Sequence, residues 1–125
     1  MSIPAELRYT KDHEWARDNG DGTYTVGITH HAQDALGPIV YVELPAAGTA
    51  VGAGDRFGTV ESTKSVSDLY SPLSGTITAK NDAVETEPES VNGAPYGAGW
   101  MVTMSASASD FAALLSADEY SALVG

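Results

Sequence analysis

The sequence predicts a mainly β fold, a flattened β-barrel or sandwich with a short internal helix and further helices near the C-terminus. Short runs rich in β-branched and aromatic residues recur along the chain, and clusters of Gly, Pro, Asn and Asp separate them. The 13 Gly and 6 Pro among 125 residues favour many turns. A hydrophobic content of 42% with 18% charged residues is typical of a compact protein, so we expect a single domain over residues 1–125.

Extended strands are expected wherever such a run lies between two groups of turn residues. The expected strands are residues 23–29, 39–44, 56–61, 66–70, 76–80 and 100–104. The turn residues at 18–22 place the first of these strands in a hairpin. Residues 39–44 are apolar almost throughout, which predicts a strand that is buried over most of its length.

Three short helices are expected outside the strands. The first covers residues 31–36 and ends at Gly37, with a proline directly after it, as is common at a helix C-terminus. Ser109 is expected to cap a second helix over residues 110–115. Residues 116–119 match the capping box Ser-x-x-Glu, which predicts the start of a third helix.

The charge balance and the absence of cysteine exclude several classes of function. The 17 acidic and 6 basic residues give a net charge of −11, which argues against nucleic acid and anionic membranes as partners. No segment approaches the ~20 apolar residues of a membrane span, and the N-terminus lacks the features of a secretion signal, so we expect a cytoplasmic protein. Without cysteine the polypeptide has no disulfide, thiolate metal site or thiol nucleophile. Any sulfur chemistry must therefore arrive on a cofactor.

Two polar clusters suggest no metal site. The spacing of Asp82, Glu85, Glu87 and Glu89 does not match a calcium-binding EF-hand, so we expect a solvated acidic loop. The adjacent His30 and His31 would point apart on a strand and share no face on a helix. Structural roles are therefore favoured over metal binding for both histidines.

Lys64 lies between two expected strands, at the tip of an expected hairpin, with small hydroxylated residues on both sides. A solvated turn lysine is the plainest interpretation of this pattern. The carboxylates of Glu61 and Asp68 favour a charged amine, whereas a Schiff-base lysine needs a neutral one. An exposed lysine of this kind is compatible with an amine that another enzyme recognises and acylates.

Residues 57–75, which contain Lys64 and, eleven residues further on, Gly75, belong to a longer ordered set of motifs. The other motifs are His13-Glu14-Trp15, Gly27-Ile28-Thr29, Ala32-Gln33, Leu36-Gly37, Val42-Glu43-Leu44-Pro45, Val91-Asn92, Pro95-Tyr96-Gly97 and Gly99-Trp100. Over about residues 9–122 this set resembles the glycine cleavage system H protein family. Pro38 and Gly93-Ala94 depart from the family, in which acidic or polar residues are usual at these positions.

The resemblance implies a lipoyl-domain type of β-sandwich, with a lipoyl-binding core over about residues 23–104 and a C-terminal helical segment over about residues 109–123. It implies lipoate covalently attached to Lys64, on a protein that is a carrier and not an enzyme. The carrier would take the aminomethyl group from glycine decarboxylase (P protein) to the aminomethyltransferase (T protein), and electrons to dihydrolipoamide dehydrogenase (L protein). A lipoyl-attaching enzyme is the fourth implied partner. The lipoyl dithiolane would supply the sulfur that the chain lacks.

Other interpretations of Lys64 stay open at this point. A biotin carrier has a related hairpin, but its lysine commonly lies between methionines, whereas Thr63 and Ser65 flank Lys64. A lipoyl domain of a 2-oxoacid dehydrogenase would not be expected to carry the His-Glu-Trp segment. The remaining alternatives are a relay protein that passes lipoate to other acceptors and an enzyme that uses Lys64 as a Schiff-base nucleophile.

A loaded carrier of this kind has to protect its aminomethyl adduct from water, which the resemblance implies is a primary amine one carbon away from sulfur. Burying the ammonium of that adduct requires a carboxylate at hydrogen-bonding distance. Glu14, in the His-Glu-Trp segment, and Asp68, four residues past Lys64, are the expected docking groups for the arm.

Overall fold

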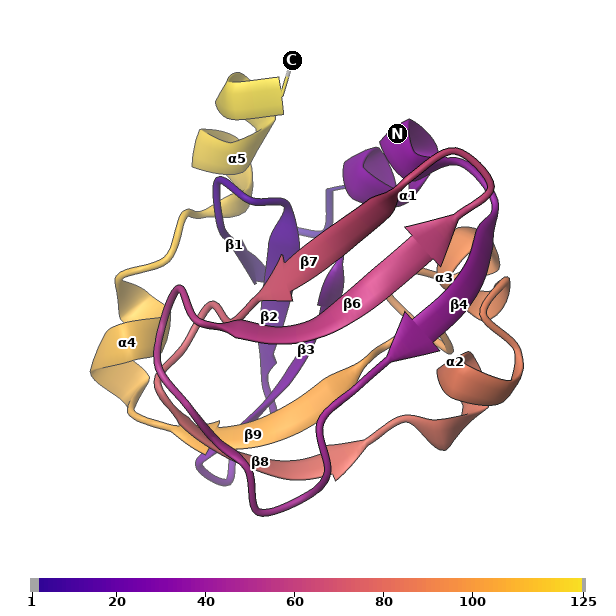
Figure 1. Cartoon of the computed structure of the whole chain (residues 1–125). Coiled ribbons are helices and arrows are strands. Elements are labelled where there is room, and N and C mark those ends of the chain that lie inside the picture. The colour runs from indigo at the N-terminus through magenta and orange to yellow at the C-terminus, as the bar shows by residue number, and fades with distance from the viewer. Residues whose placement is uncertain (1–2, 125) are drawn as a thin grey trace.

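The computed structural model describes residues 3–124, whose strands form two antiparallel sheets (Figure 1). The larger sheet has the strand order β1-β2-β3-β9-β8-β5, and the smaller has the order β4-β6-β7. The strands are β1 (Arg8–Tyr9), β2 (Glu14–Asp18), β3 (Thr23–Ile28), β4 (Ile39–Glu43), β5 (Ala50–Val51), β6 (Arg56–Ser62), β7 (Val66–Tyr70), β8 (Gly75–Lys80) and β9 (Val102–Ala106). The helices are α1 (His30–Leu36), α2 (Asp82–Thr86), α3 (Ser90–Gly93), α4 (Ala108–Ala112) and α5 (Ala117–Val124).

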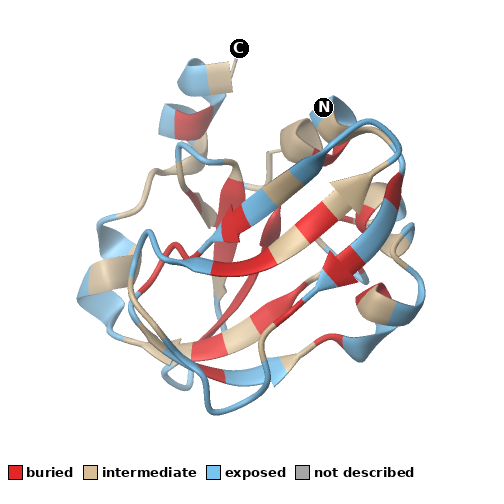
Figure 2. Cartoon of the chain, in the orientation of Figure 1, coloured by how far each residue is buried: buried red, intermediate tan, exposed pale blue. Residues whose placement is uncertain are grey.

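The main hydrophobic core lies between the two sheets. Its buried side chains include Val26 and Met104 from the larger sheet and Val42, Val60 and Leu69 from the smaller. Along the strands of the smaller sheet, buried positions are interspersed with exposed ones (Figure 2), because one face packs on the core and the other faces solvent. The mainly β sandwich that the sequence predicts is therefore the observed architecture.

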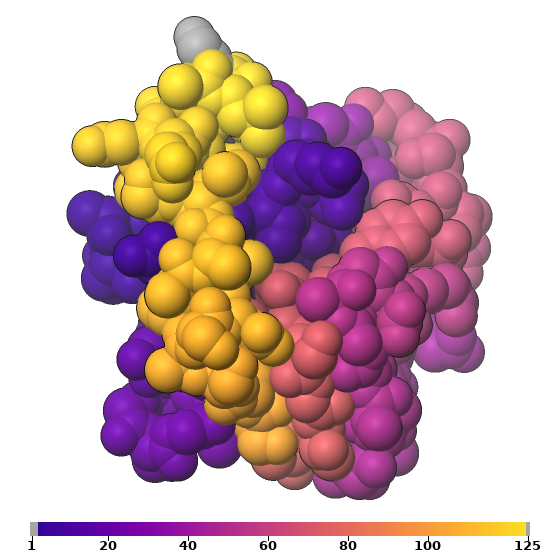
Figure 3. Space-filling view, turned by 90° about the vertical axis from the view of Figure 1, so that its left-hand side faces the viewer, coloured from indigo at the N-terminus to yellow at the C-terminus, as the bar shows by residue number. Residues whose placement is uncertain are grey.

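A second, smaller cluster joins the two ends of the chain. Leu7, Tyr9, Trp15 and Tyr120 are fully buried against one another, and the rings of Tyr9 and Tyr120 stack with their centroids 4.7 Å apart. In the space-filling view the C-terminal segment runs along one side of the molecule, next to the N-terminal residues (Figure 3). Aromatic packing on β1 and β2 thus holds helix α5 in place.

The expected hairpins and the expected internal helix are confirmed. Strands β2 and β3 pair across the turn at 18–22, and β6 and β7 pair on either side of Lys64. Helix α1 begins at His30, one residue earlier than expected, because the Thr29 side chain accepts a hydrogen bond from the Ala32 amide and caps it. It ends at Gly37, whose φ of +81° is a conformation that favours glycine.

The prediction that residues 39–44 are buried over most of their length is wrong. A β-bulge interrupts the pairing of β4 with β6: Ile39 lies opposite Ser62, while Tyr41 lies opposite Glu61. Val40 is the extra residue, and both Val40 and Tyr41 are exposed as a result. The apolar run does not predict the bulge, because the bulge depends on how β4 pairs with β6.

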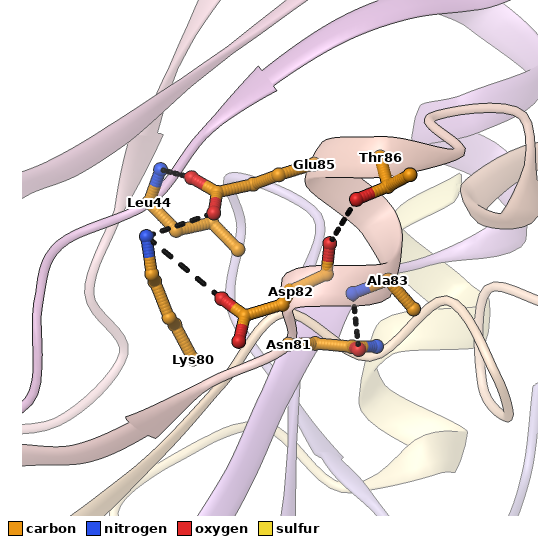
Figure 4. A network of polar contacts seen from close by, with 7 residues as sticks. All are labelled: Leu44, Lys80, Asn81, Asp82, Ala83, Glu85 and Thr86. Carbon is orange, nitrogen blue, oxygen red and sulfur yellow. Dashed lines mark hydrogen bonds and ion pairs between the residues drawn. The ribbon is translucent and has the colours of Figure 1, made fainter.

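The expected solvated loop around Glu85, Glu87 and Glu89 is also wrong in part, because this segment contains α2 and α3. The Asn81 side chain caps α2 by accepting from the Ala83 amide (Figure 4). Glu85 is only partly exposed: one carboxylate oxygen lies 2.8 Å from Lys80 Nζ, and the other accepts from the Leu44 amide at 3.2 Å. The contact with Leu44, which follows β4 and is distant in the sequence, therefore helps to fix a segment whose local charge pattern predicts a loop.

The C-terminal helices are present, but the first begins earlier than expected. The Ser107 side chain caps α4 over Ala108–Ala112, whereas the sequence predicts Ser109 as the cap. The capping box is confirmed, since the Ser116 amide donates to Glu119 Oε1 and the Glu119 amide donates to Ser116 Oγ. None of the helices in the described part of the chain is long and apolar enough to cross a membrane.

Candidate functional site

Lys64 lies on the exposed tip of the β6–β7 hairpin (Figure 1). Ser62 organises the tip: its Oγ accepts from the amides of Lys64 and Ser65, both at 3.1 Å, and its amide donates to the Ser65 carbonyl at 2.8 Å. A serine hydroxyl that accepts from backbone amides two and three residues further on stabilises a tight turn. These hydrogen bonds hold the backbone of the tip, on which Lys64 is exposed.

The tip is also tied to the junction between α1 and β4. The Thr63 amide donates to the Pro38 carbonyl at 3.1 Å, and the stem of the Lys64 side chain lies on Gly37. A Cβ atom at Gly37 would come within 2.9 Å of Lys64 Cε. Gly37 is thus required twice, for its positive φ and for the close approach of the lysine stem.

A hollow of about 350 Å³ lies beside Gly37. Its lining consists of Gln33, Asp34, Gly37, Pro38, Glu89 and Asn92. The Asn92 side chain fixes this region, since it donates to Gln33 Oε1 and to the Gly37 carbonyl and accepts from the Ile39 amide. Pro38, which departs from the usual family residue, is therefore part of this lining and lies outside the β6–β7 hairpin tip.

Glu14 is the first residue of β2 and lies beneath the open edge of β7. It is 3% exposed; Thr10 Oγ1 donates to one of its carboxylate oxygens at 2.8 Å, and the Tyr70 amide donates to the other at 3.5 Å. Burial raises the pKa of Glu14 from 4.5 to about 8, although both hydrogen bonds oppose this shift. Within residues 3–124 no basic side chain forms an ion pair with it. Glu14 is thus a buried carboxyl group that lacks a counter-ion.

The structure does not bring Asp68 to the same place as Glu14. Asp68 is exposed on the solvent face of the smaller sheet, where its carboxylate pairs with Arg56 Nε at 3.1 Å. Arg56 also donates to the Thr59 hydroxyl, so three side chains on this face are joined. The two expected docking groups therefore lie on different sides of β7.

Sequence reasoning missed the contacts of the residues around Glu14. His13 adopts a φ of +68°, which is unusual for a residue other than glycine, and its Nδ1 lies 2.8 Å from the Tyr120 hydroxyl. The same hydroxyl lies 2.8 Å from Thr29 Oγ1, the cap of α1. These contacts join residues more than 90 positions apart in the sequence, so no local pattern could reveal them.

The histidines take part in packing and hydrogen bonding. The rings of His13 and His31 lie 4.6 Å apart, and His30 Nδ1 is 3.3 Å from Gln33 Nε2. Burial, followed by the proximity of His31, lowers the pKa of His13. Among residues 3–124 no group of three or more His, Cys, Asp or Glu side chains is placed to hold a metal ion.

Comparison with known proteins identifies the family. The family model described as "Glycine cleavage H-protein" matches residues 7–125. The chain belongs to the glycine cleavage system H protein family. The H protein of Cronobacter sakazakii is 53% identical over 124 residues, which cover 98% of this chain and 96% of that protein. The H protein of Mycobacterium bovis is 56% identical over 115 residues, which cover 92% of this chain and 86% of that protein.

A solved structure supports the same assignment. The crystal structure of a glycine cleavage system H protein from Mycobacterium marinum has a TM-score of 0.88 and 44% sequence identity, covering 96% of this chain and 97% of that one. H proteins are carrier subunits of the glycine cleavage system that bear a lipoyl group on a lysine, and they are not catalysts. The P, T and L proteins of that system are the partners of this chain.

The residues at the hairpin tip fit a covalently attached lipoyl group. The attachment reaction needs an amine that another protein can reach, and Lys64 is exposed on a projecting turn. The lysine stem runs over Gly37, where the absence of a side chain leaves room for it. The tip is fixed by backbone and serine hydrogen bonds, so modification of the amine would leave the turn unchanged.

Proposed function

We propose that Lys64 carries the lipoyl group through which this H protein serves the glycine cleavage system. The observation that carries the proposal is the position of Lys64, at the fixed and exposed tip of the β6–β7 hairpin with its stem over Gly37. The chain contains no cysteine, so the attached dithiolane would supply both the electron acceptor and the sulfur that holds the aminomethyl group.

The attachment is tested by intact mass measurement of protein produced with lipoate available. We expect the addition of one lipoyl amide, and peptide sequencing should map it to Lys64. Borohydride trapping of a carbonyl substrate on unmodified Lys64 would instead support a Schiff-base enzyme. Modification at another residue would refute the assignment.

Glu14 is proposed as the group that receives the ammonium of the loaded arm. A buried carboxyl group whose pKa is about 8 is largely neutral at pH 7. An ammonium group at hydrogen-bonding distance would favour ionisation of this carboxyl, because the two charges would then compensate each other away from water. Glu14 would thus lack a charge partner in the empty carrier and gain one, the ammonium, when the arm is loaded.

Asp68 is proposed as a second docking group for the arm, although its carboxylate already has a charge partner. Its carboxylate is paired with Arg56, so contact with the arm would require it to share or release that partner. Since Asp68 lies on the solvent face of β7, it would act on a part of the arm near the hairpin, while Glu14 acts at the far end. The resulting path runs from the tip along the edge of β7.

The docking roles are tested by loading Glu14→Gln and Asp68→Asn carriers and timing the release of formaldehyde in the absence of the T protein. A docking group that shields the adduct should, when replaced, speed that release. Release as slow as that of the parent protein from both folded variants would refute docking while leaving Lys64 as the attachment site. Glu87→Gln, at an exposed residue directly after α2, is a matched control.

The whole chain is proposed to act as one carrier domain in the cytoplasm. The packing of Tyr120 in α5 on Tyr9 in β1 supports a single unit, because it joins the C-terminal segment to the first strand. A reducing compartment would also keep the dithiol in exchange with its partner enzymes. Cell fractionation with an antibody against the carrier tests the location.

A relay of lipoate to other acceptors is the second candidate function, because the exposed Lys64 amide would be equally accessible to a transferase. Incubation of the lipoylated carrier with an acceptor lipoyl domain and a lipoyl transferase tests it. Loss of the lipoyl mass from the carrier with its gain on the acceptor would support the relay.

A further inference from the structure

One side chain of the C-terminal helix α5 reaches the segment that holds Glu14. Tyr120 is fully buried, and its ring stacks on the ring of Tyr9. Its hydroxyl lies 2.8 Å from His13 Nδ1 and 2.8 Å from Thr29 Oγ1. Tyr120 therefore contacts both the residue directly before Glu14 and the residue that caps α1.

His13 has the backbone conformation that most needs such a contact. Its φ of +68° lies in the left-handed region, and among residues 3–124 no other residue apart from glycine has a positive φ. Two backbone hydrogen bonds hold its peptide groups: the His13 amide donates to the Thr10 carbonyl at 3.1 Å, and the Thr29 amide donates to the His13 carbonyl at 3.0 Å. The imidazole ring is held separately, by the Tyr120 hydroxyl and by the ring of His31.

The position of the Glu14 carboxyl group depends on the same turn. Thr10 Oγ1 accepts from the amides of Asp12 and Glu14, both at 3.2 Å, and donates to Glu14 Oε1 at 2.8 Å. Residues 10–14 thus form one hydrogen-bonded unit with His13 inside it. A change in the φ of His13 would move Glu14 relative to Thr10 and break this arrangement.

The Tyr120 hydroxyl can satisfy both of its partners at once. A phenolic hydroxyl donates one hydrogen bond and accepts another, so it can donate to a neutral His13 and accept from Thr29. Burial, followed by the proximity of His31, lowers the pKa of His13, which favours the neutral ring at pH 7. Without the hydroxyl, His13 Nδ1 and the Thr29 hydroxyl would lose a hydrogen-bond partner in a region with little water, which is costly.

We propose that Tyr120 is a positioning residue for the docking of the loaded arm: through His13 it holds the Glu14 carboxyl group where the ammonium arrives. The inference rests on the proposed docking role of Glu14. In the described part of the chain no hydrogen bond joins Tyr120 to Glu14, so the effect passes through His13. A residue 107 positions away from His13 in the sequence is thereby part of the docking site.

The ring and the hydroxyl of Tyr120 have separable roles. The ring packs on Tyr9 and holds α5 against β1, and a phenylalanine would keep this packing. The hydroxyl contacts His13 and Thr29 and adds little to the apolar contact. Tyr120→Phe therefore removes the proposed positioning contact and leaves the helix docked.

The first measurement times the release of formaldehyde from the lipoylated carrier. Each protein is loaded by the P protein with glycine, separated from it, and followed in the absence of the T protein. We expect Tyr120→Phe to release formaldehyde about fivefold faster than the wild-type protein, as for the loss of one hydrogen bond. Adding Tyr120→Phe to Glu14→Gln should give no further increase, because the hydroxyl acts through Glu14.

The second measurement needs no arm. Urea denaturation of the unlipoylated proteins at pH 6 and pH 8 gives the contribution of Glu14 as the difference between each protein and its Glu14→Gln counterpart. Burial raises the pKa of Glu14 to about 8, and a loosened turn would admit water to the carboxyl group. The stability that Glu14 removes between pH 6 and pH 8 should therefore be smaller in Tyr120→Phe than in the wild-type protein. The comparison of counterparts cancels the other titratable groups that face this turn, Asp12, His13 and His31.

Two buried tyrosines supply matched controls. Tyr9 belongs to the same cluster as Tyr120, but its hydroxyl donates to the Pro4 carbonyl at 2.6 Å, so Tyr9→Phe removes a hydrogen bond that does not involve His13. Tyr24 stacks on Phe111 with the ring centroids 5.0 Å apart, next to α4. Both Tyr9→Phe and Tyr24→Phe should leave the release of formaldehyde and the contribution of Glu14 unchanged, whatever their effect on overall stability.

Release at the wild-type rate from folded Tyr120→Phe, with faster release from Glu14→Gln, would overturn the inference and leave Glu14 as the docking group. Equal acceleration by Tyr9→Phe would also overturn it, because the effect would then be a general loosening of α5. Additive effects of Tyr120→Phe and Glu14→Gln would show that the hydroxyl does not act through Glu14. Release from Glu14→Gln at the wild-type rate would instead refute docking at Glu14 itself, and the inference would fall with it.

Discussion

Replacing Glu14 by Gln should remove a specific pH dependence from the stability of the carrier. The pKa of Glu14 is about 8 in the folded protein and about 4.5 in the unfolded chain. Between these values the folded state holds a proton that the unfolded state has lost. Raising the pH through this window therefore destabilises the fold, by about 1.4 kcal/mol for each pH unit well inside it.

The size of the effect follows from burial. Glu14 is 3% exposed, and desolvation is the largest cause of the raised pKa. Between pH 6 and pH 8 the wild-type protein should lose about 2 kcal/mol relative to Glu14→Gln, and below pH 4.5 the difference should be constant. His13 titrates in the opposite sense because burial lowers its pKa, but it is present in both proteins.

The assay is urea denaturation at a series of pH values, followed by the fluorescence of buried Trp15. The free energy of unfolding of each protein is compared at the same pH, with unchanged m-values as the condition for the comparison. Glu87→Gln, at an exposed position, should follow the wild-type curve. Parallel curves for wild type and Glu14→Gln from pH 6 to pH 8 would refute the raised pKa.

Three further predictions concern the tip and the charge of the carrier. Lys64→Arg keeps the charge and should change the free energy of unfolding by no more than ~0.5 kcal/mol, since the residue is exposed. The variant should gain no lipoyl mass and support no glycine cleavage, and retained activity would contradict the assignment. Gly37→Ala and Gly48→Ala should each destabilise by about 1–3 kcal/mol in urea, because φ is positive at both residues. Only Gly37→Ala should also slow lipoyl attachment, because only that Cβ meets the Lys64 stem. Raising the salt concentration should slow association with the P protein while the circular dichroism stays unchanged, since the −11 charge is screened over about 8 Å at physiological ionic strength.

The sequence predicts the hairpins and the Lys64 tip because local residues determine them. The turn residues at 18–22 and the Ser116 capping box act within a few positions, and both are confirmed. The bulge at Val40 depends on pairing with β6, and the hydrogen bond of Glu85 with the Leu44 amide depends on a residue that is distant in the chain. Such features are set by pairing and packing, so periodicity and composition do not reveal them.

The candidate site also combines features that local residues determine with features that depend on the fold. The family motif draws attention to Glu14, but neither its burial nor its hydrogen bonds to Thr10 and Tyr70 follow from the motif. Asp68 lies at the expected position on β7, yet its pairing with Arg56 depends on the register with β6. Sequence reasoning thus identifies the residue types, while the fold decides which of them face each other.

Two unfavourable features lie next to each other at the start of β2. His13 has a positive φ, which costs on the order of 1–3 kcal/mol, and Glu14 is a buried carboxyl group without a charge partner in the described residues. Aromatic packing on the same side of the molecule offsets them, since Tyr120 stacks on Tyr9 and its hydroxyl lies 2.8 Å from His13 Nδ1. Helix α5 therefore stabilises the backbone that places Glu14 beneath β7. The strain and the uncompensated carboxyl group are consistent with a site that is shaped for a cationic group and not for the stability of the empty carrier.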